Sequence, residues 1–276
     1  MIKKSIMCHD RPSEKMTKVS ALSRFLGSPA TPRPLSNISD QRIRFTCFSQ
    51  SANPNPSTQD LFHQIKQGFL SFKEHKYKRE EEHFKRLANL QTPKFMVIGC
   101  ADSRVCPSNI LGFQPGEAFM VRNVANLVPP AENGPTETNA ALEFGVLTLK
   151  VEHVLVIGHS NCAGIEALVR MKDDQASSLV EKWVSIAKAA KSKSTTDEAY
   201  GTNEEFQKQC RICEKESINE SLKNMFTYPW IAKRVREGLL SVHGGYYDFL
   251  DCSFQKWTFD TVKKGFVVVR DWEFWA

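Results

Sequence analysis

Two short segments of the sequence share a pattern in which an apolar run ends in glycine and a metal-ligating residue type follows. The run 95–99 precedes Cys100, and the run 154–158 precedes His159, with Cys162 three residues further on. Two thiolates and one imidazole suit zinc, and a set of three protein ligands leaves a fourth position open, as in catalytic zinc sites. The pattern therefore predicts a catalytic centre with one zinc ion per chain, held by Cys100, His159 and Cys162.

A second interpretation of these cysteines is open from spacing alone. A free cysteine is among the most buried residue types and often serves only as a small apolar side chain. Taken singly, Cys100 and Cys162 fit that role. Their place after two similar apolar runs favours metal binding, because the carboxyl ends of neighbouring parallel strands meet at one edge of a sheet.

Asp102 and Arg104 stand two residues apart, directly after Cys100. In an extended turn both side chains face the same way, and an arginine fork can hold a carboxylate through two hydrogen bonds. A carboxylate fixed beside zinc could accept the proton of a zinc-bound hydroxide and orient it. It could instead bind the metal and close the site, or the two residues could form an ordinary surface ion pair of little energetic weight.

The remaining cysteines give a weaker signal. Cys210 and Cys213 form a C-x-x-C pair inside a predicted helix, which could be redox-active or half of a metal site. No matching second pair exists, so packing is the preferred interpretation. The eight cysteines show no dense disulfide spacing, which fits a reducing compartment.

The elements that must position these residues follow from hydrophobic periodicity. Short apolar runs predict buried strands at 94–99, 118–122 and 154–158, and Thr136 is the expected N-cap of a helix over 136–151. Apolar strands that alternate with helices predict an α/β fold with a mainly parallel sheet core flanked by helices. Further helices are expected at 59–90 in one piece or two, 164–170, 178–188, 204–225 and 229–237, a solvated loop at 191–196, and C-terminal strands at 240–249, 254–259 and 265–270.

Composition excludes two classes of function. The chain has 276 residues, of which 41% are hydrophobic and 25% charged, an ordinary globular balance. No run of 18 apolar residues is present, so no membrane span is expected. Residues 1–57 hold nine Lys and Arg against three Asp and Glu, which accounts for the whole net charge of +6. The neutral remainder lacks the clustered basic residues that nucleic-acid binding needs.

The segment 1–57 differs from the rest in composition as well as in charge. It contains ten serines and six of the thirteen prolines, and an arginine interrupts its apolar stretch 19–27. Basic, serine-rich and acid-poor N-termini resemble organelle transit peptides, although an ordinary disordered tail is the alternative. The folded domain is then expected to cover 58–276.

Several longer motifs resemble those of plant β-class carbonic anhydrases, from about residue 60 to the C-terminus. These are CADSRVCPS at 100–108, FQPGEAF at 113–119, RNVANLVPP at 122–130, VIGHSNCAGI at 156–165, CEKESIN at 213–219 and HGGYYD at 243–248. The resemblance implies zinc-dependent, reversible hydration of carbon dioxide to bicarbonate and a proton, by attack of a metal-bound hydroxide that Asp102 and Arg104 orient.

The same resemblance implies the rest of the site and the assembly. Gln91 matches a glutamine that holds the substrate, and three side chains match apolar pocket walls, namely Phe119, Val124 and Phe144. The family is active as a dimer or a multiple of dimers, with pocket residues shared between subunits and a helical arm at about 59–75 that wraps the neighbour. On family grounds the transit-like segment favours the chloroplast stroma, with the mitochondrial matrix as alternative.

Two residues depart from the family pattern, and three rival functions stay open. Phe144 stands where many plant members have tyrosine. Ala163 stands where glycine is usual, and its methyl group could narrow the pocket or strain the backbone. The rivals are hydrolysis of a related molecule such as carbonyl sulfide, a non-catalytic zinc protein, and a thiol redox protein using Cys210 and Cys213. A dinucleotide enzyme is disfavoured because no G-x-G-x-x-G follows a strand.

Overall fold

The structure is a computed structural model that describes residues 57–172, 176–194, 202–263 and 266–276. All but the last residue of the expected transit segment 1–57 therefore lies outside the described residues. The chain divides into two units, residues 1–66 and 67–276. The sheet and the candidate site belong entirely to the second unit. None of the helices within the described ranges is both long and apolar enough to cross a bilayer.

The first helices confirm the prediction for 59–90, in two pieces. Helix α1 (Thr58–Phe72) continues through a π-helical turn, η1 (Lys73–Tyr77), and is followed by α2 (Glu81–Asn89). Helix α1 has no buried residue, although it carries the large apolar side chains of Phe62, Ile65 and Phe69. An apolar helix face of this size is typical of a surface that another protein surface covers.

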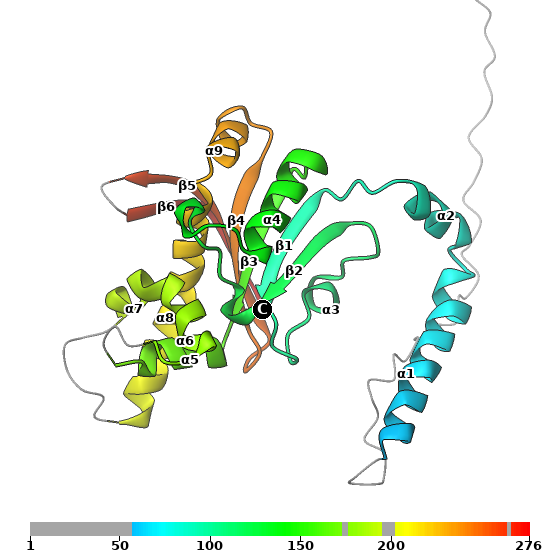
Figure 1. The fold of residues 1–276 in the computed structure, drawn as a ribbon, viewed down its shortest axis with the longest axis horizontal. Helices are drawn as coiled ribbons and strands as arrows, with labels where there is room; N and C mark the ends of the chain where they lie inside the picture. Colours follow the sequence, from blue (N-terminus) through cyan, green and yellow to red (C-terminus); the bar gives the residue numbers. More distant parts are fainter. Residues whose placement is uncertain (1–56, 173–175, 195–201, 264–265) are drawn as a thin grey trace, which may run out of the picture. The chain divides into compact units, whose positions relative to one another are not determined.

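A six-stranded sheet forms the centre of the second unit (Figure 1). Its strands are β1 (Phe95–Cys100), β2 (Ala118–Asn123), β3 (His153–His159), β4 (Ser241–Asp248), β5 (Ser253–Lys263) and β6 (Phe266–Trp275), in the order β2-β1-β3-β4-β5-β6. The first four are parallel, and β5 and β6 extend the sheet in antiparallel fashion. The predicted α/β class with a mainly parallel core and a C-terminal strand extension is confirmed.

Strand register places the two predicted ligand segments at the same edge. Cys100, the last residue of β1, is opposite Asn123 of β2, and Gly99 is opposite Ile157 of β3. Because β1 and β3 run in the same direction, Cys100 and His159 emerge from the sheet side by side. The apolar runs that predicted these strands are buried almost completely, as parallel strands covered on both faces must be.

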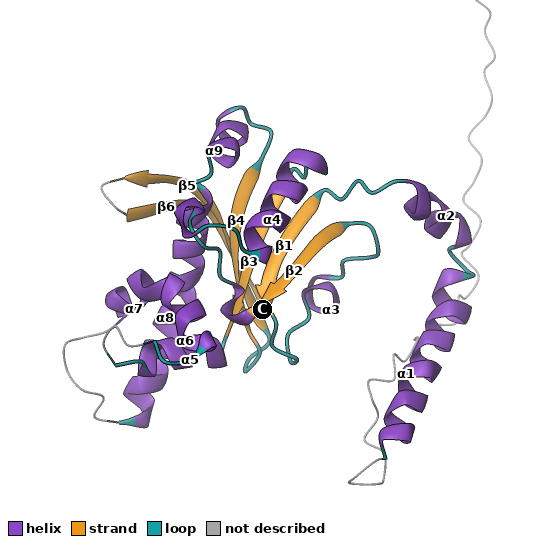
Figure 2. Ribbon diagram, in the orientation of Figure 1, coloured by secondary structure: helices purple, strands orange, loops and turns teal. Residues whose placement is uncertain are grey.

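Helices cover one face of the sheet with the main apolar core. Met96, Ile98, Val154 and Val156 belong to this core, together with Trp257 of β5. Three helices that Figure 2 draws in purple close it, namely α4 (Glu137–Glu143), α8 (Asn203–Met225) and α9 (Pro229–Arg236). Thr136 caps α4 as predicted, because its hydroxyl accepts a hydrogen bond from the backbone of Asn139.

A second group of helices surrounds the segment that carries Cys162. Helices α5 (Ala163–Arg170) and α7 (Lys188–Ser194) pack beside α8, and α6 (Leu179–Val184) packs on α5. The predicted loop at 191–196 is wrong for 191–194, which are helical, and the rest of it lies outside the described residues. Ser194 is buried, and the Lys191 ammonium group donates to the carbonyl of Met171. These tertiary contacts hold polar residues in a helix that their composition did not suggest.

Shorter elements complete the fold. A short helix that periodicity did not predict, α3 (Pro107–Leu111), follows the β1 loop and packs beside the other face of the sheet. The remaining turns are η2 (Val124–Asn126), η3 (Ala131–Asn133), η4 (Phe144–Thr148) and η5 (Ser185–Ala187).

Candidate metal centre

Cys100, His159 and Cys162 form a compact, buried cluster at the carboxyl edge of the parallel strands. Their ligand atoms all lie within 4.8 Å of one another, and the two sulfur atoms are 4.0 Å apart. The three residues are 6%, 1% and 2% exposed, respectively. Cys162 is the residue that precedes the first turn of α5, so the His-x-x-Cys spacing brings its thiol back beneath His159. No other group of three or more potential ligands occurs within the described part of the chain.

The histidine of this cluster is prepared to bind a metal ion. Its Nδ1 atom lies 2.9 Å from the carbonyl oxygen of Ser160, which fixes the proton on Nδ1. Its Nε2 atom is buried and has no hydrogen-bond partner among the described residues. A buried polar atom without a partner costs free energy, so it calls for an explanation, and a bound ion supplies one. The donor set and the free nitrogen therefore fit zinc.

The two thiols are electrostatically coupled, and this coupling also favours a bound cation. A hydrogen bond from Cys162 lowers the pKa of Cys100 to about 4, and the same interaction raises the pKa of Cys162. The pair therefore carries one negative charge readily and resists the second. A divalent cation between the sulfur atoms would remove that resistance, because a coordinating thiol is deprotonated outright.

Asp102 and Arg104 form the two-point contact that their spacing suggested. The guanidinium donates from Nε to Oδ1 at 3.0 Å and from Nη2 to Oδ2 at 2.7 Å, and the Arg104 backbone N–H adds a third bond at 2.8 Å. The Asp102 side chain is 13% exposed, whereas that of Arg104 is 52% exposed. The Arg104 side-chain hydrogen bonds lower the pKa of Asp102 to about 2. Asp102 lies outside the group of three candidate ligands, and its carboxylate faces Arg104.

The Arg104 guanidinium is itself held in place from the other ligand segment. Its Nη2 atom donates to the carbonyl oxygen of Asn161 at 3.0 Å, next to Cys162. Its central carbon lies 4.7 Å from the ring centroid of Phe249, a cation–π contact. The pair is thus more than a free surface ion pair, because the arginine bridges the loop after β1 and the loop after β3.

Arg122 positions the loop that carries Cys100 and Asp102, a role that no motif or spacing in the sequence indicated. From the edge strand β2 it donates to three backbone carbonyls of that loop. The acceptors are Cys100 at 2.9 Å, Asp102 at 2.7 Å and Val105 at 2.5 Å. The guanidinium of Arg122 therefore fixes the backbone between Cys100 and the Asp–Arg pair.

Glu214 supports the other ligand segment and was also missed. Its side chain is 2% exposed, and Oε1 accepts a hydrogen bond from the backbone N–H of Cys162 at 3.0 Å. Oε2 accepts from the hydroxyl of Tyr246 at 2.7 Å. Burial raises the pKa of Glu214. The carboxyl group lies 52 positions from its partner in sequence, so no local spacing could reveal the contact.

The C-x-x-C pair on α8 lies next to Glu214 in a buried, apolar environment. Cys210 and Cys213 are buried in the apolar cluster between α5 and α8. Burial raises the pKa of Cys210 to about 12 and the pKa of Cys213 to about 11. Reactive cysteines need a thiolate, so these values favour packing, as preferred from the sequence.

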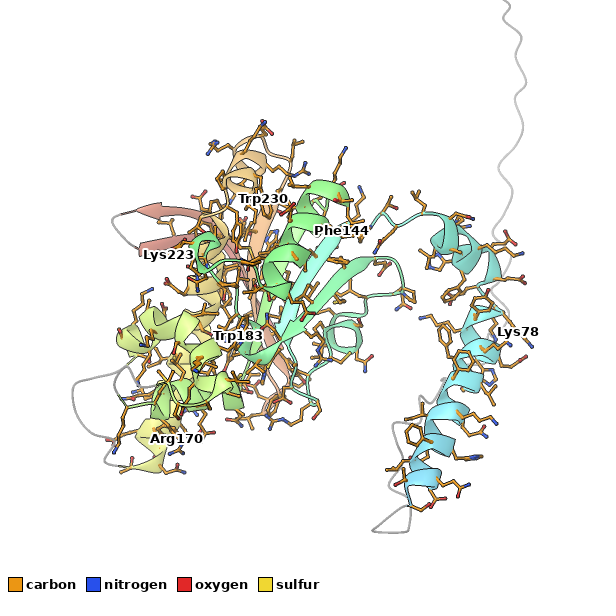
Figure 3. The ribbon with its side chains drawn as sticks, in the orientation of Figure 1. Lys78, Phe144, Arg170, Trp183, Lys223 and Trp230 are labelled. Carbon is orange, nitrogen blue, oxygen red and sulfur yellow. The ribbon has the colours of Figure 1, made fainter. Side chains whose placement is uncertain are left out.

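The four expected pocket residues fall into two groups. Val124 lies beside the metal-ligand segment, since a methyl group built on Gly164 would approach it to 2.8 Å, and Trp183 (Figure 3) donates to its carbonyl at 2.7 Å. Phe119 contacts Phe144, which is labelled in Figure 3, with ring centroids 5.7 Å apart. Phe119 pairs with Met96 near the beginning of β1, at the end of the strand away from Cys100.

Within one chain, Gln91 lies further still from the cluster of Cys100, His159 and Cys162. It is exposed and precedes β1, whereas Cys100 is the last residue of that strand. Six strand residues span roughly 17–20 Å. A single chain therefore brings Val124 to the cluster but leaves Gln91, Phe119 and Phe144 away from it.

Comparisons with known proteins agree on one family. A family model described as carbonic anhydrase matches residues 95–254. Beta carbonic anhydrase 5, chloroplastic, of Arabidopsis thaliana is 58% identical over 202 residues, which cover 73% of this chain and 66% of that relative, slightly less than two thirds of its length. Beta carbonic anhydrase 6, mitochondrial, of the same plant is 49% identical over 89% of this chain and 84% of its own length.

A solved structure shows the same fold. One of two tetrameric β-carbonic anhydrases from the ascomycete Sordaria macrospora superposes with a TM-score of 0.60 at 27% identity. The superposition covers 71% of this chain and 96% of that one. With the family model, the curated relatives and the solved structure in agreement, the chain belongs to the β-class carbonic anhydrase family.

Proposed function

We propose that this chain hydrates carbon dioxide reversibly to bicarbonate and a proton, with one zinc ion held by Cys100, His159 and Cys162. The buried cluster with its unpartnered His159 nitrogen, next to a carboxylate fixed by an arginine, is the observation that carries the proposal. Membership of the carbonic anhydrase family supports the reaction. A structural zinc site would need neither the Asp–Arg pair nor an open position.

In this proposal each protein group has one task. Zinc held by these three residues would supply Lewis acidity, which lowers the pKa of water to about 7. Asp102, whose pKa is about 2, is ionised at that pH and acts only as a hydrogen-bond acceptor. Its oxygens already accept from Arg104, so its direction is set before the substrate arrives. Asp102 would therefore orient the attacking oxygen, and Arg104 fixes the direction of the carboxylate.

Backbone positioning by Arg122 and Glu214 completes the arrangement. Arg122 fixes the loop from Cys100 to Val105, and Glu214 fixes the N–H of Cys162. Partners of metal ligands commonly tune metal affinity as well as ligand direction. We assign both residues to positioning, since neither side chain is among the ligand cluster.

We further propose that the active unit is a dimer or a multiple of dimers. Gln91, Phe119 and Phe144 cannot reach the cluster of their own chain, so their predicted substrate-binding role requires a second copy. The exposed Phe144 ring and the exposed apolar face of α1 support such an interface. The Sordaria macrospora relatives are described as tetrameric.

We propose import into the chloroplast stroma, with the mitochondrial matrix as the alternative. The basic, serine-rich composition of 1–57 and the names of two relatives, one chloroplastic and one mitochondrial, support an organelle. The higher identity to the chloroplastic relative favours the plastid. A fluorescent fusion to residues 1–57 in leaf cells tests this assignment, and a cytosolic signal would contradict it.

The catalytic assignment is tested with Asp102→Asn, which keeps the size of the side chain but removes its charge. We expect this variant to retain one zinc per chain and to lose most turnover in stopped-flow carbon dioxide hydration. Glu204→Gln, a matched carboxylate-to-amide change at an exposed position on α8, should leave both unchanged. Full activity of Asp102→Asn would refute the role of the carboxylate.

A further inference from the structure

A large cavity lies at the amino ends of the parallel strands, opposite the carboxyl ends where Cys100, His159 and Cys162 meet. It has a volume of about 770 Å³ and is lined by the beginnings of β3 and β4, the end of α9 and parts of β5 and β6. Helix α9, which carries Trp230 in Figure 3, ends at this cavity. His153 borders it and His159 belongs to the metal cluster, so the length of β3, roughly 20 Å, separates the two sites. Its size is in the range of small-molecule sites, about 300–1,000 Å³.

The charged residues that line the cavity are mostly basic. Four cationic side chains face two carboxylates, and these residues are Lys150, Arg234, Arg236, Arg270, Glu152 and Asp260. Glu152 is already paired with a lysine outside the lining, Lys94. Arg270 has only a distant contact with a neighbouring carboxylate, 3.7 Å from Asp271. Across the described ranges Lys150 and Arg236 form no ion pair. Asp260 is the one lining carboxylate besides Glu152, so positive charge in the cavity is in excess.

One of these side chains has an unsatisfied donor inside the protein. The Nε atom of Arg234 is buried and has no hydrogen-bond partner among the described residues. The same guanidinium donates once, from Nη2 to the carbonyl of Leu239 at 3.3 Å, out of five available N–H groups. A buried donor without a partner is uncommon and points to an acceptor that the protein itself does not supply.

Stabilisation of a helix end explains only part of this arrangement. Basic residues in the last turn of α9 favour the negative end of its dipole, which accounts for Arg234 and Arg236. It does not account for Lys150, which precedes β3, or for Arg270 on β6. Lys150 also has a left-handed backbone, with φ of 56°, a conformation that favours glycine over lysine. Cationic side chains from three separate segments of the chain therefore line one cavity.

A chain of hydrogen-bonding groups borders the same cavity. The Ser241 hydroxyl lies 2.6 Å from Nδ1 of His153 and 2.7 Å from Nε2 of His243, whose Nδ1 lies 3.1 Å from the Thr258 hydroxyl. Burial, followed by the positive charges of Lys256, His153 and Arg270, lowers the pKa of His243 to about 4.

We propose that this cavity binds a small organic dianion, a phosphate ester or a dicarboxylate, between Lys150, Arg234, Arg236 and Arg270. Guanidinium groups bind phosphate and carboxylate through paired hydrogen bonds, and lysine adds a point charge. The site is separate from carbon dioxide hydration and does not depend on the proposed reaction.

Titration calorimetry on the zinc-loaded full chain at low ionic strength tests the proposal, with inorganic phosphate and succinate as two separate probes. We expect saturable binding of at least one probe, and the stronger one identifies the ligand type. Arg236→Gln combined with Arg270→Gln should weaken binding at least tenfold. Lys182→Gln combined with Lys208→Gln, an equal loss of exposed charge on α6 and α8, should change it less than twofold.

Hydrogen exchange on the same samples locates the ligand. Slower exchange at 234–242 on addition of the probe is the expected result. No saturable binding of either probe would overturn the proposal. It would also be overturned by equal binding to all three proteins, or by protection confined to the segments around Cys100 and Cys162, since the anion would then lie elsewhere. Thermal melting of each variant confirms that it is folded.

Discussion

Arg104 offers the sharpest test of how the Asp–Arg pair works, because its charge and its geometry can be separated. Arg104→Gln removes both guanidinium bonds to Asp102, at 3.0 and 2.7 Å, and leaves the backbone bond at 2.8 Å intact. Arg104→Lys keeps a positive charge but cannot present the planar two-point fork. Comparison of the two variants distinguishes the effect of the positive charge from the effect of orienting the Asp102 carboxylate.

The protonation state of Asp102 does not change in this experiment at neutral pH. Its pKa is about 2 with Arg104 present, against an ordinary value of 3.8. Without the arginine it rises toward or above 3.8, which is still well below 7. A depressed pKa contributes stability that is present above pH 3.8 and is lost as the pH falls through about 2. That contribution is at most about 2 kcal/mol, and it is complete at assay pH.

The loss of activity must then come from direction. Hydrogen bonds to charged groups contribute about 1.5–3 kcal/mol each, and two are removed. If about half of their combined strength serves to aim the carboxylate, the barrier rises by about 1.5–3 kcal/mol, a decline of about 10–150-fold in kcat. We expect Arg104→Lys to lose nearly as much as Arg104→Gln.

Stopped-flow carbon dioxide hydration between pH 6.5 and 9, with zinc measured on each sample, is the assay. Both variants should hold one zinc and keep the shape of the pH profile at a lower rate. Near-normal turnover in Arg104→Lys would refute the argument from direction, because charge alone would then suffice. Recovery of Arg104→Gln at high pH would refute the argument that Asp102 stays ionised.

Three further predictions concern residues around the site and the sheet. Glu214→Gln places an amide nitrogen opposite either the Cys162 backbone N–H or the Tyr246 hydroxyl, so zinc affinity should fall about 10–100-fold in chelator competition. Unchanged affinity would mean that Glu214 does not support the site. Gly244→Ala places a methyl carbon 2.3 Å from the buried ring of Trp257 and should cost about 1–3 kcal/mol in urea unfolding. Gly68→Ala, with nothing within 4 Å, should be neutral or gain about 0.5–1 kcal/mol, and equal effects of the two changes would show that the sheet adapts. Burial lowers the pKa of His243 to about 4, so the unfolded chain takes up a proton before the folded chain does. The free energy of unfolding therefore falls as the pH is lowered from 6.5 to 4, and His243→Gln should remove up to about 3 kcal/mol of that fall. An identical dependence on pH in the variant would contradict the assignment.

Short-range patterns in the sequence predicted the part of the site that depends on strand ends. Two apolar runs ending in glycine were sufficient to place Cys100 and His159 together, because parallel neighbours in register end at one edge. The His-x-x-Cys spacing added Cys162. Asp102 and Arg104 are local neighbours, and their two-point contact follows from that spacing. That these residues bind zinc and act on carbon dioxide stays a prediction.

Contacts between distant segments could not be read from spacing. Glu214 meets the backbone of Cys162 across 52 positions, and Arg122 reaches back 22 positions to the carbonyl of Cys100. Both depend on how α8 and β2 pack, which no periodicity encodes. The same limit applies to Gln91, whose expected role came from family resemblance and which a single chain leaves at the other end of β1.

The most direct test measures zinc content and carbon dioxide hydration on the same preparation of the chain and of its Cys162→Ser variant. We predict one zinc per chain with fast, pH-dependent hydration, and a large loss of both zinc and turnover in Cys162→Ser. A well-folded chain without zinc, or a Cys162→Ser variant with undiminished zinc, would contradict the metal centre. One zinc without turnover at any pH would contradict the proposed reaction.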